Sequence, residues 1–234
     1  MPFLILLATL AFALSPLLSP GFGGFEDDQF PIPQIDPPVQ PAGYAFGIWG
    51  LIYALLIAAA LYGVWQRRSD PQWQAMRLPL LVTLVVGATW LPIAQTSAVW
   101  ATVLIWIMWA FAVWAVLNAP RGDGADKWLG RVPVALYAGW LTAASCVSLG
   151  LMAAGYGAMN QTVAAILALL IALGLALWVA RQRPDALGYL AGVIWALIGV
   201  CVQNATGGST YVLVLAAAGA AALIAVGGNN IKRT

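Results

Sequence analysis

The strongest constraint on this chain is a series of apolar stretches, each long enough to cross a lipid bilayer. A helix needs about 20 mostly apolar residues to cross the roughly 30 Å hydrocarbon core. Charged or Pro/Gly-rich segments separate eight such stretches, at residues 2–18, 42–65, 78–95, 98–117, 132–153, 162–180, 186–203 and 210–226. Strands of a membrane barrel alternate apolar and polar residues over about ten positions, and these stretches do not. The sequence therefore predicts an all-α integral membrane protein with about eight spans.

Composition leads to the same fold class. Hydrophobic residues make up 62% of the chain and charged residues 8%, and the mean hydropathy is +0.89. Soluble domains contain about 25% charged residues because their surface faces water. We therefore expect lipid to be the main partner of this surface. The net charge of +2 gives no reason to expect nucleic acid.

The basic residues indicate the orientation. All ten fall in alternate connections between the predicted spans or after the last one, and the opposite loops contain none. The positive-inside rule assigns the basic side to the cytoplasm, so both termini are expected there, in a bacterial-type inner membrane. The ten are Arg67, Arg68, Arg77, Arg121, Lys127, Arg131, Arg181, Arg183, Lys232 and Arg233.

The N-terminal quarter contains two segments with alternative interpretations. The first apolar stretch is short and could be a signal peptide, but a positive n-region and a clear cleavage site are missing, so a retained helix is expected. The following loop, residues 19–41, is rich in Pro and Gly and includes acidic Glu26, Asp27, Asp28 and Asp36. It is either a plain linker or a lid over an outward-facing pocket, and its length favours the lid.

The last three spans differ from the others. They are rich in Ala, Gly and Leu, and Gly188, Gly192 and Gly199 share one helix face that would let helix backbones approach closely. Packing within the molecule is the first interpretation of that face, and a homodimer or a membrane-protein partner is the alternative. We therefore divide the chain into a five-helix bundle, residues 1–157, and a three-helix extension, residues 158–234.

Several chemistries lack their usual residues. The chain has no histidine, so His-ligated metal or haem and a Ser-His-Asp triad are not expected. No ionisable residue falls in the middle of a predicted span, which disfavours proton-relay transport. The sequence therefore predicts a non-enzymatic protein with no metal site.

Aromatic residues are the candidate functional groups. Phe46, Trp49 and Tyr53 share one helix face, and three later spans add further aromatic residues at middle depth. Core packing is the alternative for any one of them, but together they suit a planar hydrophobic ligand in an aromatic cavity. The candidate ligand-binding residues are Tyr44, Phe46, Trp49, Tyr53, Trp90, Gln95, Trp106, Trp109, Tyr137, Trp140 and Ser148.

These residues resemble motifs of the TspO/MBR family of tryptophan-rich sensory proteins. The segment 41–53 is similar to the signature P-P-x-W-x-F-x-x-x-W-x-x-L-Y, with Tyr44 at the first Trp. Trp90 and Pro92 resemble the W-x-P of the family's third helix, and Tyr137 and Trp140 the Y-x-x-W of its fifth. The resemblance covers about residues 1–155 and implies a TspO-like five-helix bundle, to which the last three spans are an addition.

The resemblance implies a membrane receptor, sensor or carrier, with a tetrapyrrole as the first candidate ligand. Two departures remove polar groups from the expected cavity, because Gly87 and Ser148 stand where the family has Asn. One alternative function is an accessory subunit or assembly factor of a larger membrane complex, and another is an enzyme that acts on the bound pigment, for which the sequence shows no acid–base pair or metal site.

Overall fold

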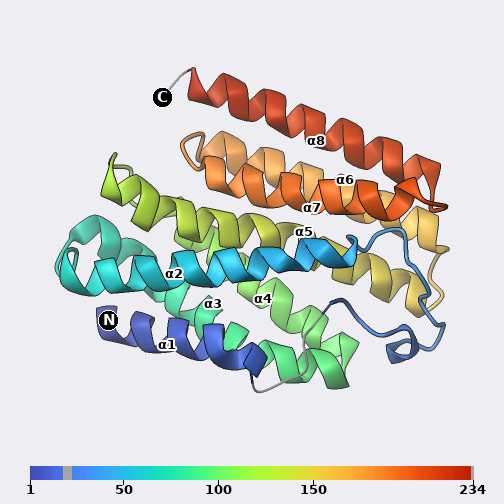
Figure 1. Ribbon diagram of the computed structural model, residues 1–234, viewed down its shortest axis with the longest axis horizontal. Helices are drawn as coiled ribbons and strands as arrows, with labels where there is room; N and C mark the ends of the chain where they lie inside the picture. Colours follow the sequence, from blue (N-terminus) through green and yellow to red (C-terminus); the bar gives the residue numbers. More distant parts are fainter. Residues whose placement is uncertain (18–22, 233–234) are drawn as a thin grey trace.

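The computed structural model describes residues 1–17 and 23–232, and over this part the chain forms eight α-helices and no strand (Figure 1). Seven of the helices are long and apolar enough to cross a membrane. The predicted all-α membrane fold is confirmed. Leu18, residues 19–22 of the loop and Arg233 lie outside the described residues. The helices are α1 (Pro2–Leu14), α2 (Ile48–Trp65), α3 (Pro71–Thr96), α4 (Ala98–Leu117), α5 (Val132–Gly155), α6 (Gln161–Gln182), α7 (Leu187–Ala205) and α8 (Thr210–Ile231).

The observed bounds agree best with the prediction at α4 and least at α3. Helix α3 begins well before residue 78 because Asp70 caps it, accepting hydrogen bonds from the backbone N–H groups of Gln72 and Trp73. Pro71 occupies the first turn, where no hydrogen-bond donor is required. Because that turn contains polar residues, a prediction from hydropathy alone places the start of this helix too late.

Helix α1 is the short member of the set. Its 13 residues extend about 20 Å, less than the roughly 30 Å hydrocarbon core, and a 3-10 turn (Ser15–Leu17) continues it. It packs against α2 and α3. Phe12 is 3% exposed and is the part of α1 that reaches the aromatic residues of the other helices.

Helix α5 is the central column of the bundle. Helices α1 to α4 lie on one side of it and α6 to α8 on the other (Figure 1). Helix α7 packs directly on α5 through glycines: a Cβ on Gly192 would lie 2.7 Å from the carbonyl oxygen of Leu136. Gly199 faces Pro41 and Ala45 with the same closeness.

The glycine face is therefore used inside the molecule. Gly192 and Gly199 are buried, and Gly188 is close to the carbonyl oxygen of Val132 on α5. Because α5 and the outer loop occupy this face, the structure favours the first interpretation of the sequence, packing within the molecule, over a homodimer or partner seam through these three glycines. The division at residue 157 stays a prediction.

A buried hydroxyl network also joins the two sides. The Thr142 hydroxyl on α5 donates to the carbonyl oxygen of Ala138. Trp109 on α4 donates its indole N–H to Thr142 over 3.0 Å, and the Tyr189 hydroxyl on α7 lies 2.7 Å from the same oxygen. Because the Thr142 proton is already donated, Tyr189 is the donor in that pair. Helices α4, α5 and α7 are thus tied at one point.

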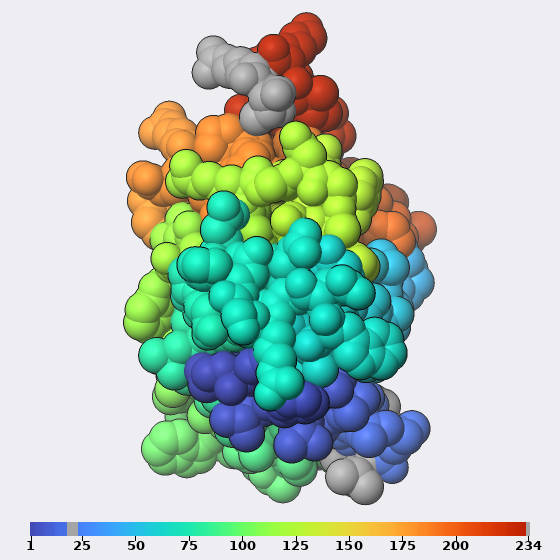
Figure 2. All heavy atoms as spheres, turned by 90° about the vertical axis from the view of Figure 1, so that its left-hand side faces the viewer, coloured from blue at the N-terminus to red at the C-terminus, as the bar shows by residue number. Residues whose placement is uncertain are grey.

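One end of the bundle gathers both described chain ends and three helix connections. Figure 2 views this end, with the N-terminal residues in dark blue, the α2–α3 and α4–α5 turns in teal and yellow-green, and the α6–α7 turn in orange. All described basic residues lie in these segments or within two turns of the helix ends beside them. The two described chain ends lie at this same end (Figure 1).

Arginines at this end close the C-termini of helices. Arg77, 3% exposed, donates to the carbonyl oxygens of Arg67 and Arg68 after α2. Arg183, 2% exposed, donates to carbonyl oxygens at the end of α4. Terminal carbonyls of a helix have no partner within the helix and carry partial negative charge. These basic residues therefore stabilise helix ends as well as indicating orientation.

Asp185 neutralises two of these arginines. Its carboxylate lies 2.9 Å from Nε of Arg183 and 3.2 Å from a guanidinium nitrogen of Arg131. Burial alone would raise the pKa of Asp185, but hydrogen bonds from Arg183 and the charges of both arginines outweigh burial. The pKa of this carboxyl is consequently held below its usual value.

Candidate ligand-binding site

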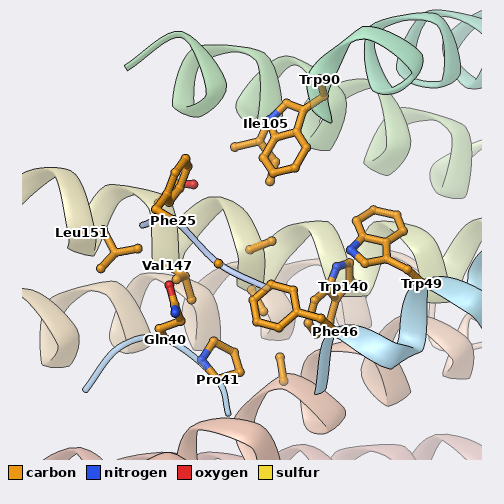
Figure 3. Close-up of a pocket in the computed structure, with 15 residues that line it drawn as sticks. Phe25, Gln40, Pro41, Phe46, Trp49, Trp90, Ile105, Trp140, Val147 and Leu151 are labelled. Carbon is orange, nitrogen blue, oxygen red and sulfur yellow. The ribbon is translucent and has the colours of Figure 1, made fainter. Parts of the chain in front are cut away.

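A narrow cavity lies at the end of the bundle opposite the basic residues, between the outer loop and five helices. Its free volume is about 40 Å³, enough for water but well below the 300–1,000 Å³ of typical ligand pockets. Figure 3 shows loop residues at one end of it and aromatic rings at the other. The lining comprises Gly24, Phe25, Gln40, Pro41, Phe46, Trp49, Trp90, Ile105, Trp140, Ala143, Ala144, Val147, Ser148, Leu151 and Ala196.

The inner end of this cavity is built from rings at right angles. Trp140 meets Phe46 edge-to-face with centroids 5.7 Å apart, and it meets Trp49 in the same way at 6.2 Å. Trp49 in turn stacks on Tyr53 at 5.4 Å, with an angle of 22° between the ring planes. Phe46 precedes α2 in a 3-10 turn (Gly43–Gly47), and Trp49 and Tyr53 follow on α2 itself.

Few polar atoms face the cavity. The indole N–H of Trp90 is already donated to the carbonyl oxygen of Ala101 over 2.9 Å. The indole nitrogen of Trp140 is buried and has no hydrogen-bond partner among the described residues. Ser148 and Gln40 supply the other polar side chains, and no residue that lines the cavity is charged. The cavity can therefore bind by aromatic contact and by a small number of directed hydrogen bonds.

A second, larger cavity lies on the other side of the same aromatic wall. Its free volume is about 290 Å³. Phe46, Trp49 and Trp90 line both cavities, so a shift of these three rings would join them. The other residues around the second cavity are Phe12, Ala13, Ser15, Pro16, Gly50, Tyr53, Gly87, Leu91 and Met108.

Gly87 has a specific role in the second cavity. A Cβ at this position would lie 2.7 Å from the ring of Phe12. The Phe12 ring contacts Tyr53 edge-to-face at 5.1 Å and Trp49 at 5.7 Å. Gly87 thus makes room for an aromatic ring from α1 in the wall of the second cavity.

The outer loop covers the first cavity and is fastened to four helices. Its Gln29 side chain donates to the carbonyl oxygen of Ala94 at the end of α3, and the Ile32 N–H donates to Gly155 O on α5. Phe25 and Gln40, on either side of these contacts, both line the cavity.

The later part of the loop is held by α6 and α7. Gln161 donates to the side-chain oxygen of Gln34, and Asn204 donates to Pro38 O over 2.8 Å. Trp195 on α7 donates its indole N–H to Ala45 O, at the start of the second predicted span. The described part of the loop thus lies over the first cavity, which is the position that a lid would take.

The structure brings together only part of the predicted site. Phe46, Trp49, Trp90, Trp140 and Ser148 line the first cavity, and Tyr53 lines the second. The remaining five, which line neither cavity, are Tyr44, Gln95, Trp106, Trp109 and Tyr137.

These five have other surroundings. Tyr44 is 50% exposed and meets Trp195, and Gln95 is exposed at the end of α3. Trp106 and Trp109 contact each other on α4 at 5.0 Å. Tyr137 is buried, with its hydroxyl 2.9 Å from that of Thr83 and its ring near Phe12. Tyr137 thus packs against the rings of the aromatic wall without lining either cavity itself.

Sequence reasoning missed the residues contributed by α1, the loop and α7. The missed residues that line the cavities are Phe12, Phe25, Gln40 and Ala196. The sequence around each of them is either apolar throughout or part of a loop, so it contains no periodic pattern from which a contact with a distant segment could be predicted. The only signal in the sequence was the length of the loop, which favoured a lid but did not indicate which of its residues face the cavity.

Comparison with known proteins decides the family. A model of the TSPO-like protein family matches residues 31–228. The chain belongs to this family. The matched region of this TSPO-like protein leaves out α1 and includes α6, α7 and most of α8, so it extends beyond the five helices on which the resemblance was based. No curated protein and no solved structure matches the chain. The seven long apolar helices and the family together make it a multi-pass membrane protein.

Proposed function

We propose that this TSPO-like protein is a non-enzymatic receptor, sensor or carrier for a planar hydrophobic ligand, with a tetrapyrrole as the first candidate. The observation that supports it most is the pair of adjacent cavities that share Phe46, Trp49 and Trp90 as one aromatic wall. Flat apolar ligands are held by stacked and edge-to-face rings of this kind. The loop that covers the first cavity would enclose the ligand.

The sizes of the cavities indicate how a ligand would be accommodated. A free volume of about 40 Å³ cannot take a tetrapyrrole, whereas the second cavity, at about 290 Å³, approaches the size of a small-ligand pocket. Binding therefore requires the shared rings to rotate and the two cavities to merge. Such a ligand would lie against Trp49 and Trp140 at the same time.

The charge pattern supports a position for the cavities in the membrane and a side from which the ligand would enter. With the basic end in the cytoplasm, the cavities and the loop lie near the outer face of a bacterial-type inner membrane, and both termini lie inside. The ligand would then reach the site from the outer leaflet or the outer aqueous phase.

The lining supports binding over catalysis. It offers indole, hydroxyl and amide groups, which can orient a ligand, and no carboxylate or basic side chain faces the first cavity. General acid–base chemistry requires a group that can exchange a proton near neutral pH. The alternative function, an accessory subunit of a larger complex, loses its main support because the glycine face is covered inside the molecule.

Quenching of tryptophan fluorescence by protoporphyrin dimethyl ester, an uncharged tetrapyrrole, tests the proposal. We expect saturable quenching by the detergent-purified protein, and an affinity lowered about tenfold in Trp49→Ala, since loss of an aromatic contact and its buried area costs roughly 1.4 kcal/mol or more. Trp65→Ala is the matched control because Trp65 is 74% exposed on α2. Non-saturable quenching, or an equal effect of both substitutions, would count against the proposal.

A further inference from the structure

Trp140 has an unused hydrogen-bond donor at the inner end of the first cavity. The residue is 2% exposed, and its Nε1 has no partner among the described residues. A buried N–H group without an acceptor costs about 1–3 kcal/mol, and native structures rarely leave one without a reason. Helix α5 fixes the position of this donor, because it is the central helix of the bundle.

No acceptor of the cavity itself is in reach of that donor. Ser148 is eight residues further along α5, which is about 12 Å at 1.5 Å per residue. Gln40 comes from the loop and lies at the opposite end of the cavity from Trp140 (Figure 3). The neighbours at the inner end are the apolar ring of Phe46 and the indole of Trp49. An acceptor for Trp140 must therefore come from a molecule inside the cavity, either a water or a ligand.

The charges around the cavity exclude an anionic acceptor. No basic residue lines it, and the described basic residues all lie at or near the opposite end of the bundle. The loop that covers it carries exposed Glu26, Asp27 and Asp28. A carboxylate placed at Trp140 would lose its hydration and gain only one hydrogen bond, at a cost of several kcal/mol.

We propose that the ligand is uncharged and presents a carbonyl-type acceptor to Nε1 of Trp140. This inference rests on the proposed function and narrows its ligand class. For a tetrapyrrole, it selects a neutral form whose carboxylates are esterified or absent. The outward polar groups, Ser148 and Gln40, would then contact the edge of the ligand nearest the loop.

Two planar probes of nearly equal shape isolate the hydrogen bond. Anthracene has no acceptor, whereas 9,10-anthraquinone has the same ring frame and two carbonyl oxygens. Binding is measured by equilibrium dialysis against protein-free micelles, which removes partition into detergent. We expect anthraquinone to bind about threefold to tenfold more tightly, the range of one net hydrogen bond.

Variants assign that preference to one indole. Trp140→Phe removes the donor together with part of the aromatic contact, so we expect both probes to bind more weakly and the preference for anthraquinone over anthracene to vanish. Trp106→Phe is the matched control: its Nε1 is also buried without a partner, but it lines neither cavity. The preference should survive in that variant.

A charged probe tests the claim that the ligand is uncharged. Anthraquinone-2-carboxylate at neutral pH should bind at least about tenfold more weakly than anthraquinone. Equal binding of the charged and neutral probes would overturn the claim of an uncharged ligand. Equal binding of anthracene and anthraquinone to the unaltered protein would show that the Trp140 N–H faces a ring, and would overturn the hydrogen bond.

Failure of this inference can be separated from failure of the proposed function. If none of the three probes nor protoporphyrin dimethyl ester binds saturably, the planar-ligand site itself is refuted. If the probes bind but show no preference, the site stands and only the role of Trp140 is refuted. The comparison of probes on the unaltered protein decides the matter even if Trp140→Phe does not fold.

Discussion

Replacing Gly139 with Ala tests whether close backbone contact holds α7 against α5. An added Cβ would be placed directly against the carbonyl oxygen of Tyr189 and 2.9 Å from its carbonyl carbon. These are backbone atoms, so no side-chain rotation can relieve the overlap and the helices must separate. Overpacking of this kind typically costs 1–3 kcal/mol, and we expect about 3 kcal/mol here. For a chain of this size that corresponds to a fall in Tm of roughly 6–12 °C.

The measurement is thermal unfolding in detergent, followed by circular dichroism. Gly174→Ala on α6 is the matched control, because a Cβ there meets nothing within 4 Å, and we expect its Tm to stay equal or rise slightly. Since Trp140 follows Gly139 directly, the affinity for anthracene should also fall in Gly139→Ala. If the two variants unfold within about 2 °C of each other, the close contact of α5 and α7 is not a major source of stability.

Three further predictions test separate parts of the structure. Thr142→Val leaves the donors of Trp109 and Tyr189 without an acceptor and should lower the stability by about 1–3 kcal/mol in chemical or thermal unfolding; a loss under 0.3 kcal/mol would refute the network. The pKa of Asp185 is lowered in the folded protein, so its contribution is present above its unfolded pKa of about 3.9 and is lost as the pH falls below that value. The Tm of the unaltered protein should therefore drop between about pH 5 and pH 3, and Asp185→Asn should be less stable at neutral pH with a smaller acid-induced drop; parallel curves would contradict this. Gly87→Ala should lower the Tm because its Cβ would overlap Phe12, and the double variant with Phe12→Ala should show non-additive loss in a double-mutant cycle.

The sequence was sufficient for the membrane architecture because one physical requirement dominates it. Lipid forces long, apolar, internally hydrogen-bonded helices, and α4 begins and ends where hydropathy predicted. Hydropathy does not detect a polar first turn, so the start of α3 at Pro71 was missed. It also gives no information on which faces of apolar helices meet.

The candidate site was only partly predictable for the same reason. Phe46, Trp49 and Trp140 were recognised from their residue types and family-like spacing, and the structure places them together. Tyr44 fits the same signature but is half exposed, and Gln95, the other predicted residue of this kind that was misplaced, is exposed at the end of α3. In a chain where nearly every helix face is apolar, periodicity cannot separate lipid-facing from buried positions.

The role of α7 likewise depends on three-dimensional contacts. Gly192 and Tyr189 bring α7 against α5, and Ala196 completes the cavity wall. The sequence showed a helix able to pack closely but not its partner. A five-helix bundle without this helix would leave the cavity open on one side.

The most direct test of the central claim is the absorbance spectrum of the protein purified from its own membrane, together with mass analysis of extracted small molecules. We expect a planar, uncharged chromophore that absorbs at longer wavelength than tryptophan, in amounts that decrease in Trp49→Ala and stay unchanged in Trp65→Ala. A protein that carries no such molecule and fails to bind any planar probe saturably would contradict the account.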